Sequence, residues 1–402
     1  MLWWLFVMGD EPSVQKTVEF LRHTFHQYYA DHRIELPDRF ARREFAFLFF
    51  GGKGMVRHLA FEKREAVWEF LEERAPQHVY YSSAYYHQPN AAKMQDKTWM
   101  GAELIFDLDS DHLPNAERLS YVESLVDVKK EFKKLVKEFL LGDFGFQEKY
   151  LELYFSGGRG YHCHVKDPCV LDLDSNERWE IVDYITGRDL QDTIIFHDQA
   201  TGRKSYGQYS FASGKSLKMP TPDQAGWKGR ISRGLIELVD EIKKSDDPEK
   251  KLQEYGVSKK EAERLVEELS EERMKRIKDG LLDQSKTIRR FFLNRALRST
   301  AVALSAGETD EPVTCDVKRL IRLPSSLHGK TGFKVVKIAI DDLDAFDPLR
   351  DAVVLLADPV KVTLMKPVTI TMKDETFQLA EGEQEVPTFL AVFLIGRKDA
   401  II

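Results

Sequence analysis

The 402-residue sequence is poor in cysteine, in long apolar runs and in net positive charge. Its three cysteines, Cys163, Cys169 and Cys315, form no CxxC pair, which argues against a disulfide framework and a standard zinc site and favours a reducing, cytoplasmic location. The apolar start MLWWLFVM has only eight residues and lacks the flanks of a signal peptide, so we expect a packed terminal strand or a tail, and no membrane role. The formal net charge of −7 excludes a uniformly basic nucleic-acid coat, although a locally basic cleft remains compatible with it.

What is present suits a globular protein with a full-sized core, since 43% of the residues are hydrophobic and 31% are charged. Helical and strand-like patterns alternate, and this predicts an α/β (α+β) fold with a mixed sheet and a helical insert. We expect the first part of the core in residues 1–196 and its second part, with C-terminal strands, in residues 299–402. Between them, residues 197–298 would form a polar loop region followed by the helical insert.

Hydrophobic periodicity predicts the individual elements. Helices are expected over residues 12–30, 63–74 and 119–141, and charged helices over 231–298, where SKKE (258–261) is a capping box. The run REFAFLFFGGKGMVRHLAF (43–61) predicts a β-hairpin. Strands are further expected at 313–323 and 333–340, and in a C-terminal series over 352–356, 360–365, 367–372 and 388–395.

Two carboxylates stand close together in LIFDLD (104–109). Alternate side chains of a strand face opposite sides, so Asp107 and Asp109 share one face, roughly 6–7 Å apart. This spacing suits a hard divalent cation, which binds carboxylates together with substrate phosphates. Taken alone, the pattern is equally typical of a strand that ends in solvent.

A third acid lies in VTCDVKR (313–319). If this run is a strand, Asp316 faces away from the apolar side on which Cys315 fills the core. Beside Asp107 and Asp109, Asp316 would complete a two-metal carboxylate site for phosphoryl transfer. As an isolated residue it is typical of a solvated strand acid.

The stretch YFSGGRGYHCHV (154–165) places three glycines around one arginine between two strand-like runs. Gly157 and its neighbouring glycines permit a tight turn and a close approach of backbone amides to a ligand. Arg159 offers a guanidinium suited to phosphate, and Ser156 and His162 add hydrogen-bond donors. The spacing does not match the dinucleotide fingerprint GxGxxG, and a glycine hairpin with a surface arginine is the alternative. We interpret His164 as structural.

The run RLIRLPSSLHGKTG (319–332) is a basic loop rich in hydroxyl groups. It is not a P-loop, because Pro324 stands where that motif requires glycine. Arg322, His328 and Lys330 are suited to phosphates, although a polar turn between strands would look the same. Glu44 and Arg57 in the first hairpin could orient one another or a substrate, or form an ordinary surface pair.

In combination these motifs resemble the small, catalytic subunit of archaeal-eukaryotic type DNA primases. The family pattern of a DxD strand, an SGxRGxH turn, and an Asp followed by a P-x-S-x-H loop ending in KTG occurs here in that order, over most of residues 12–340. The resemblance implies that Asp107, Asp109 and Asp316 ligate two Mg²⁺ or Mn²⁺ ions. It further implies roles for a set of nucleotide-binding and phosphate-binding residues, namely Ser156, Gly157, Arg159, His162, Arg322, His328, Lys330, Arg57 and Glu44.

The resemblance also implies function and partners. The chain would synthesise primers on single-stranded DNA from NTP or dNTP, in a heterodimer with a large, regulatory primase subunit. Relatives often carry a zinc knuckle between the DxD strand and the SGxRGxH turn, but residues 110–155 hold no cysteine and only His112, so we predict no structural zinc. The alternatives are a stand-alone primase-like repair polymerase, a non-catalytic scaffold subunit that keeps the fold, and a two-metal nuclease.

Overall fold

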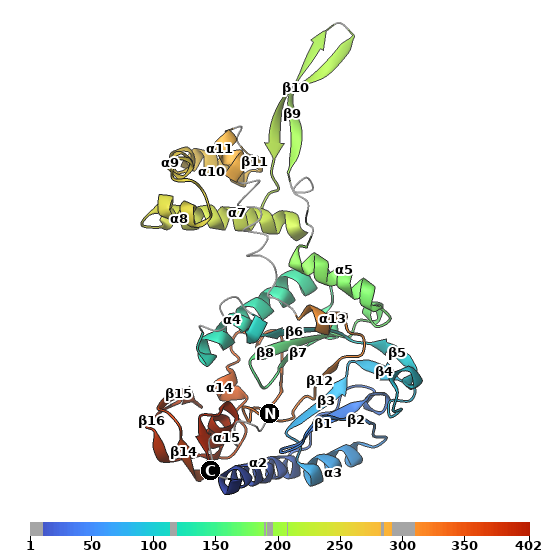
Figure 1. Cartoon of the computed structure of the whole chain (residues 1–402). Coiled ribbons are helices and arrows are strands. Elements are labelled where there is room, and N and C mark those ends of the chain that lie inside the picture. Colours follow the sequence, from blue (N-terminus) through green and yellow to red (C-terminus); the bar gives the residue numbers. More distant parts are fainter. Residues whose placement is uncertain are drawn as a thin grey trace. The chain divides into compact units, whose positions relative to one another are not determined.

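The computed structural model of the chain describes residues 11–112, 119–188, 190, 196–206, 208–282, 285–291 and 310–402. The segment 1–8, expected as a strand or tail, lies outside the described residues. The chain divides into one compact unit of residues 1–133, 146–179 and 309–402, and a second of residues 134–145 and 180–308 (Figure 1). The division into 1–196, 197–298 and 299–402 stays a prediction.

Two four-stranded antiparallel sheets form the centre of the first unit (Figure 1). One has the order β12-β3-β1-β2, with strands Leu320–Arg322, His78–Ser82, Phe45–Leu48 and Val56–Leu59. The other has the order β13-β7-β8-β6, with strands Val336–Ile338, Leu151–Phe155, Gly160–Val165 and Leu104–Asp109. Both sheets bring strands from the end of the unit beside strands from its beginning, so distant motifs can meet.

Helices and three small sheets complete the first unit. The helices are α2 (Glu11–Asp31), α3 (Arg64–Arg74), α4 (Tyr121–Lys134), α13 (Glu311–Cys315), α14 (Pro348–Asp351) and α15 (Thr388–Arg397), and α5 (Ser175–Thr186) begins in this unit. The small sheets pair β4 (Ala84–Tyr86) with β5 (Trp99–Ala102), β15 (Val368–Met372) with β16 (Glu375–Leu379), and β14 (Pro359–Leu364) with β17 (Gly382–Pro387) and β18 (Ala400–Ile401). The α+β fold class expected from the sequence is confirmed. The expectation of a mixed sheet is wrong, because all the strand pairs among the described residues are antiparallel.

The second unit is mainly helical. Its helices are α7 (Gly226–Lys244), α8 (Pro248–Glu254), α9 (Lys259–Glu268), α10 (Glu271–Lys278) and α11 (Lys286–Phe291), with a π-helical segment at Leu135–Asp143. The helical insert is thus confirmed for the described residues. The polar loops predicted for 197–230 are wrong for residues 197–218, because β9 (His197–Tyr206) and β10 (Tyr209–Lys218) form a long antiparallel hairpin there, joined by β11 (Leu281–Leu282). In a hairpin the inward-facing backbone groups pair across the two strands and the outward-facing groups can bond to water, so a polar sequence is compatible with it. Residues 219–225 lie outside any helix or strand, as predicted.

Most predicted elements of the first unit are confirmed, including the first helix, the hairpin of β1 with β2, and the strand Leu104–Asp109. The strand expected at 388–395 is wrong, because these residues form α15. Every residue from Thr388 to Ile395 is buried, and a short run that is apolar on all sides shows no period that separates helix from strand. The expected strand at 352–356 is also wrong, since this segment holds no strand.

The first half of the strand expected at 313–323 is a helix instead. Asp310 caps α13 by accepting a hydrogen bond from the backbone N–H of Val313, and Pro312 stands in the first turn. An Asp cap with a proline directly inside the helix is a start signal that the alternating side chains obscured. Cys315 is buried, as expected of a core-filling residue.

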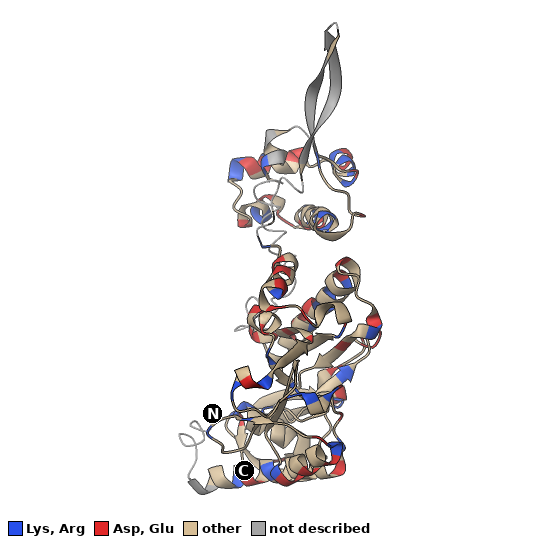
Figure 2. Cartoon of the chain, turned by 90° about the vertical axis from the view of Figure 1, so that its right-hand side faces the viewer, with Lys and Arg blue, Asp and Glu red and all other residues tan. Residues whose placement is uncertain are grey.

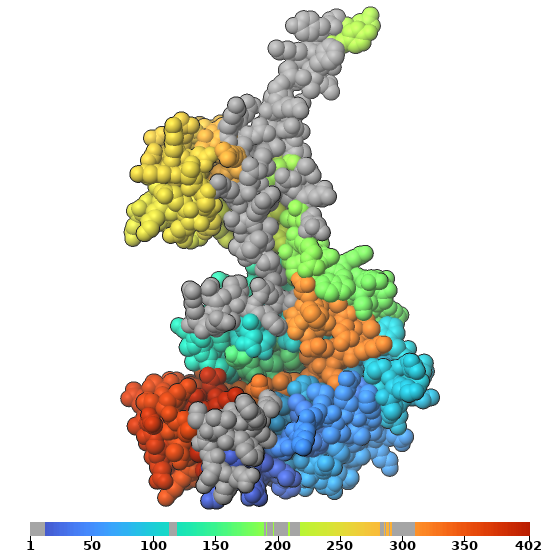
Figure 3. Space-filling view, viewed as in Figure 1, coloured from blue at the N-terminus to red at the C-terminus, as the bar shows by residue number. Residues whose placement is uncertain are grey.

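The two ends of the first unit meet. The backbone N–H of Ile402 donates to Thr17 Oγ1 at 3.1 Å, and Ser13 Oγ donates to the carbonyl of Ile402 at 3.0 Å. In the space-filling view the C-terminal residues, in red, accordingly lie close to the N-terminal residues, in blue (Figure 3). Charged residues of both signs are interspersed on helices and loops, while the central strands are largely uncharged (Figure 2). None of the described helices has the length and apolar character needed to cross a membrane.

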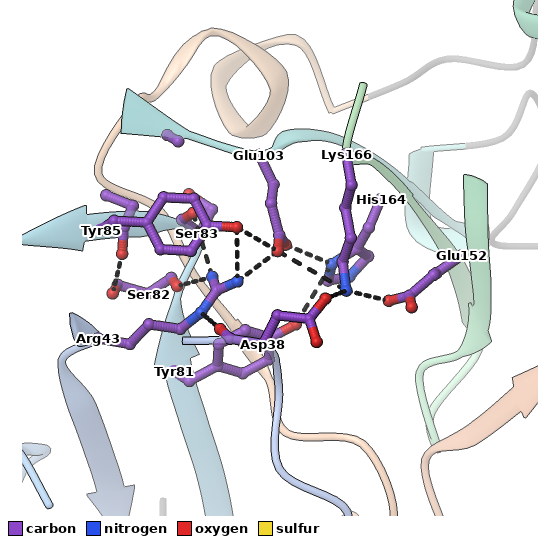
Figure 4. Close-up of polar contacts among 12 residues, drawn as sticks. Asp38, Arg43, Tyr81, Ser82, Ser83, Tyr85, Glu103, Glu152, His164 and Lys166 are labelled. Carbon is purple, nitrogen blue, oxygen red and sulfur yellow. Dashed lines mark hydrogen bonds and ion pairs between the residues drawn. The ribbon is translucent and has the colours of Figure 1, made fainter. Parts of the chain in front are cut away.

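A buried polar network connects the two large sheets (Figure 4). The guanidinium of Arg43, just before β1, forms an ion pair with Glu103, just before β6, and neither side chain is exposed. Glu103 also accepts from Tyr85 Oη at 3.1 Å and lies 3.0 Å from His164 Nδ1 on β8. Lys166 pairs with Glu152 at the edge of the same network. His164 is therefore part of the scaffold, which agrees with its interpretation as structural.

The network holds its acidic groups ionised. Burial alone would raise the pKa of Glu103, but Arg43, His164 and Lys166 outweigh burial and hold this pKa far below its usual value. Burial likewise opposes the ionisation of Glu152, yet hydrogen bonds from lysines lower its pKa to about 2. Burial lowers the pKa of His164, so its neutral form is favoured.

These shifts predict that the first unit loses stability in acid. Glu103 and Glu152 have lower pKa values folded than unfolded, so their contribution is present above about pH 4.5 and lost as the pH falls through the folded values. Neutral His164 acts in the same direction, because the unfolded histidine takes up a proton below about pH 6.5. The urea midpoint of unfolding should therefore begin to fall below about pH 6.5 and should fall further between about pH 4.5 and about pH 2. A midpoint that is constant or rises over this range would contradict the prediction.

Candidate active site

The register of one antiparallel strand pair joins the two strongest motifs of the sequence. Strand β8, which follows the SGGRG turn, runs antiparallel to β6, which carries the DxD pair. In this register Asp107 lies opposite His162, and Asp109 lies opposite Gly160. Residues that are about fifty positions apart in the chain thus form neighbouring pairs at one end of the sheet.

Asp107 and His162 are in direct contact. The Nε2 atom of His162 lies 3.2 Å from Asp107 Oδ1, and the two side chains are 5% and 20% exposed. Burial would raise the pKa of Asp107, but His162, Arg319 and Arg322 outweigh it and hold the carboxyl below its usual pKa. Asp107 is therefore an ionised carboxylate whose second oxygen remains available for a cation. The His162 Nδ1 atom is buried and lacks a hydrogen-bond partner among the described residues.

Ser156 shapes the SGGRG turn. Its hydroxyl oxygen accepts hydrogen bonds from the backbone N–H groups of Gly158 at 3.2 Å and Gly160 at 3.3 Å. The hydroxyl proton is still free to donate, so a phosphate contact of Ser156 is compatible with this role. Arg159 projects from the turn, 42% exposed, and forms an ion pair with Asp111.

The glycines of this turn are needed for contacts within the protein. At Gly157, whose φ is +76°, a Cβ atom would lie 2.8 Å from the Cβ of His328. At Gly160 it would lie 2.4 Å from the carbonyl oxygen of Leu108 on β6. The sequence analysis explained these glycines by the close approach of a ligand. That explanation is incomplete, because His328 and β6 pack so closely against the turn that Gly157 and Gly160 are needed even without a ligand.

Gly160→Ala should separate β8 from β6, because the clash is with the backbone and cannot be relieved by a side-chain rotation. We expect a loss of about 1–3 kcal/mol in the free energy of unfolding, together with weakened nucleotide binding. Gly54→Ala is the matched control, since a Cβ there meets nothing within 4 Å. Urea unfolding of both variants measures the effect, and equal stability of the two would refute the close contact.

The loop 323–332 brings further predicted residues to the same turn. His328 is buried, and Thr331 Oγ1, adjacent to its ring, donates to the carbonyl of Gly157 at 2.5 Å. Arg322 donates to Nδ1 of His78 at 2.7 Å. Burial and the neighbouring cations Arg322 and Lys330 hold the pKa values of His328 and His78 well below the usual value. Both imidazoles are therefore neutral in a strongly electropositive environment.

That Asp316 converges with Asp107 and Asp109 on one metal site stays a prediction. Asp316 is exposed and follows the C-terminus of α13, where its carboxylate accepts from the backbone N–H of Lys318 at 2.9 Å. Among the described residues, no three His, Cys, Asp or Glu side chains are arranged to hold one metal ion. Asp107 and Asp109 on β6 fit a cation by their chemistry and shared strand face. The helix that precedes Asp316 is hydrogen-bonded to β6, because the N–H of its N-cap residue Asp310 donates to the carbonyl of Asp107 at 2.9 Å.

Glu44 and Arg57 do contact one another. Arg57 Nε donates to Glu44 Oε1 at 3.0 Å, with Glu44 buried and the Arg57 side chain 38% exposed. Lys97, also buried, lies 3.5 Å from the second carboxylate oxygen of Glu44. The interpretation of an ordinary surface pair is thus wrong, because Glu44 anchors Arg57 from inside the core.

A pocket of about 630 Å³ opens beside the SGGRG turn. Five residues predicted from the motifs line it, namely Asp109, Arg159, Arg322, His328 and Lys330. The other predicted residues do not line it, although Asp107 and His162 lie on the adjoining strands. The pocket also contains cationic residues that the sequence analysis missed: Lys53 of the GGKG loop, and Arg397 and Lys398 at the end of α15. No local motif marks these three, since only the fold brings them to the pocket.

Two neighbouring carboxylates next to a cationic pocket suit a metal-bound polyphosphate, and comparison with known proteins agrees with this chemistry. Residues 106–340 match the family described as DNA primase small subunit. The chain belongs to the DNA primase small subunit family. It is 42% identical over 392 residues to the DNA primase small subunit PriS of Methanothrix thermoacetophila, covering 95% of this chain and 98% of that protein.

Other archaeal members of the primase small subunit family align over similar lengths. The PriS of Methanocella arvoryzae is 38% identical over 395 residues, covering 96% of this chain and 98% of the relative. The PriS of Picrophilus torridus is 38% identical over 385 residues, covering 93% and 95%. The resemblance inferred from the ordered motifs is confirmed. The match to the primase family spans β6, the SGGRG turn and the loop 323–332, and ends before α15.

Proposed function

We propose that the chain is the catalytic subunit of a DNA primase and synthesises primers in DNA replication. It would transfer nucleotides from NTP or dNTP to a 3′-hydroxyl on a single-stranded DNA template. The proposal rests on one observation in this member of the primase small subunit family. The strand that carries the DxD pair is antiparallel to the strand after SGGRG, and a cationic pocket lies beside them. A metal-activated transfer of a nucleotidyl group from a triphosphate needs this combination of carboxylates and cations.

The two aspartates of β6 are the proposed metal ligands, for Mg²⁺ or Mn²⁺. When bound, the ion would neutralise negative charge on the phosphoryl group that is transferred. Asp316 remains the proposed third ligand, supported by the hydrogen bond that ties the start of its helix to Asp107. Binding of Mn²⁺, followed by its paramagnetic signal, should weaken in Asp316→Asn if this assignment holds.

The chain's own residues would hold and orient the nucleotide. Arg159, Arg322 and Lys330 are suited to neutralise a triphosphate, and neutral His328 can donate a hydrogen bond without being protonated. His162 keeps Asp107 ionised and oriented. Arg57, anchored by Glu44, would contact nucleotides near the 3′-hydroxyl. In the reaction that hydroxyl attacks the α-phosphorus, a new phosphodiester forms, and pyrophosphate leaves.

The partners are proposed on the same basis. The chain would work with a large primase subunit, which we expect to dock away from Asp107 so that the cleft stays open to template. Single-stranded DNA and NTP or dNTP are the proposed substrates. We further propose that the chain carries no structural zinc, and a metal assay finding stoichiometric zinc in the purified protein would overturn this.

The deciding experiment uses the chain co-expressed with its large subunit, a single-stranded template and radiolabelled nucleotides. New dinucleotides and longer primers, formed without a pre-existing 3′ end, are expected. Extension of existing ends without initiation would instead indicate a repair polymerase. Template degradation without nucleotide addition would indicate a nuclease, and primer synthesis that survives the loss of Asp107 would indicate a scaffold subunit.

A further inference from the structure

The C-terminal helix α15 ends at the cationic pocket. Arg397 is its last residue, and Lys398 caps it with a left-handed backbone conformation, φ +73°. Both residues line the pocket together with Arg159, Arg322 and Lys330. The primase family match ends at residue 340, so α15 lies outside the part of the chain that carries the known motifs.

Helix α15 rests directly on the loop 323–332. A Cβ atom at Gly396 would lie 2.1 Å from the carbonyl oxygen of Lys330, and one at Gly332 would lie 2.7 Å from Val392 Cγ1. Such distances leave no room for a side chain at either position, so helix and loop are in backbone contact. Lys330 and the end of α15 are therefore held at a fixed separation.

Arg397 is also linked to the SGGRG turn. Its guanidinium lies over the ring of Tyr121, 4.6 Å from the ring centroid, and Tyr121 Oη donates to the carbonyl of Gly158 at 2.8 Å. Burial is the main cause that raises the pKa of Tyr121, and Arg397, Arg159 and Asp109 all act on the same hydroxyl. Arg397 lines the same pocket as the candidate phosphate ligand Arg159 and the candidate metal ligand Asp109.

The charges of the pocket suit an extended anion. Among the residues that the structure describes, six cationic side chains line it against two carboxylates, Asp109 and Asp111. Helix C-termini carry partial negative charge and repel anions, so a helix that ends at a phosphate site needs cations there. Arg397 and Lys398 provide two, and the planar guanidinium of Arg397 is suited to phosphate oxygens.

We propose that Arg397 and Lys398 bind the terminal phosphates of the incoming nucleotide, so that α15 completes the nucleotide site of the catalytic unit. This inference rests on the proposed primase function. It assigns to the C-terminal segment a role in distinguishing a triphosphate from nucleotides with fewer phosphates. The α-phosphate would remain with the metal ligands, and the outer phosphates would reach the end of the helix.

The test measures nucleotide binding rather than synthesis. Arg397→Met, Lys398→Met and the double variant are prepared in the complete chain with its large subunit, and NTP, NDP and NMP compete with a fluorescent NTP. Loss of a charge-assisted contact should raise the dissociation constant for NTP about 10-fold in each single variant. Affinity for NMP should remain within about 2-fold of wild type, and Arg397→Lys should recover part of the NTP affinity.

Lys366→Met is the matched control. Lys366 pairs with Asp399 at 2.7 Å, as Arg397 does at 3.7 Å, but it is 64% exposed and does not line the pocket. Wild-type NTP affinity is expected for this control. Unchanged NTP affinity in the double variant, or an equal loss for NTP and NMP, would overturn the inference. Failure of the proposed function is a separate result: a wild-type complex that binds NTP but makes no primers.

Discussion

Asp107→Asn should abolish nucleotide addition, lowering its rate by about 1,000-fold or more. The substitution keeps the shape of the side chain but removes the charge that the proposed metal ion needs. Metal ions supply several kcal/mol of charge stabilisation in the transition state, and each 1.36 kcal/mol corresponds to a factor of ten in rate. Single-turnover incorporation of a labelled nucleotide opposite a template base measures the effect.

Asp127→Asn is the control for Asp107→Asn, because Asp127 is an exposed aspartate on α4 and is not one of the predicted site residues. It should retain the wild-type rate. Binding of Mn²⁺ should weaken in Asp107→Asn and remain unchanged in the control. An Asp107→Asn variant that melts normally and still adds nucleotides at the wild-type rate would exclude Asp107 as a metal ligand and leave the scaffold alternative in force.

Glu103→Gln should cause the largest loss of stability. It leaves the buried guanidinium of Arg43 without its carboxylate, in a site where neither side chain reaches solvent. Removing one partner of a buried ion pair typically costs about 3–5 kcal/mol, because the remaining charge is buried without compensation. Urea unfolding monitored by circular dichroism, with the large subunit absent, measures the difference in free energy.

The same chemical change at an exposed pair provides the comparison. Glu72 lies 3.9 Å from Arg33, and their side chains are 41% and 60% exposed. Glu72→Gln should therefore change the stability by less than about 1 kcal/mol. Glu103→Gln should also flatten the dependence of stability on pH, since the variant lacks the carboxyl with the strongly lowered pKa. Equal stability losses for the two substitutions would show that the network contributes nothing specific.

Prediction from sequence worked best where a local pattern has one physical interpretation. The alternation in LIFDLD and the glycine cluster in SGGRG each predicted a strand or turn, and β6, β7 and β8 confirm them. It worked poorly for Thr388–Arg397, where burial on all sides removes the periodicity, and for Glu311–Cys315, where a short cap signal competes with alternation. In the first case burial in the tertiary structure hides the period, and in the second a local cap signal outweighs the alternation.

The glycines of the SGGRG turn illustrate the same limit for function. The presence of these glycines predicted that another group lies close to the backbone of the turn, but the sequence could not identify that group as a ligand or as another part of the protein. The structure shows that His328 and the backbone of Leu108 occupy that space. The partner of a close contact is set by distant parts of the chain, and a local motif carries no information about them.

By itself the sequence determined the chemistry available to this protein: ordered motifs with two paired aspartates, a phosphate-suited arginine and a basic loop, which were sufficient to identify the family. Only the tertiary structure decided which of these groups meet. It paired Asp107 with His162, buried Glu103 against Arg43, and brought Arg397 from the C-terminus to the pocket. The reason is physical, because residue types and spacing set local geometry, whereas contacts between distant segments depend on how the whole core packs.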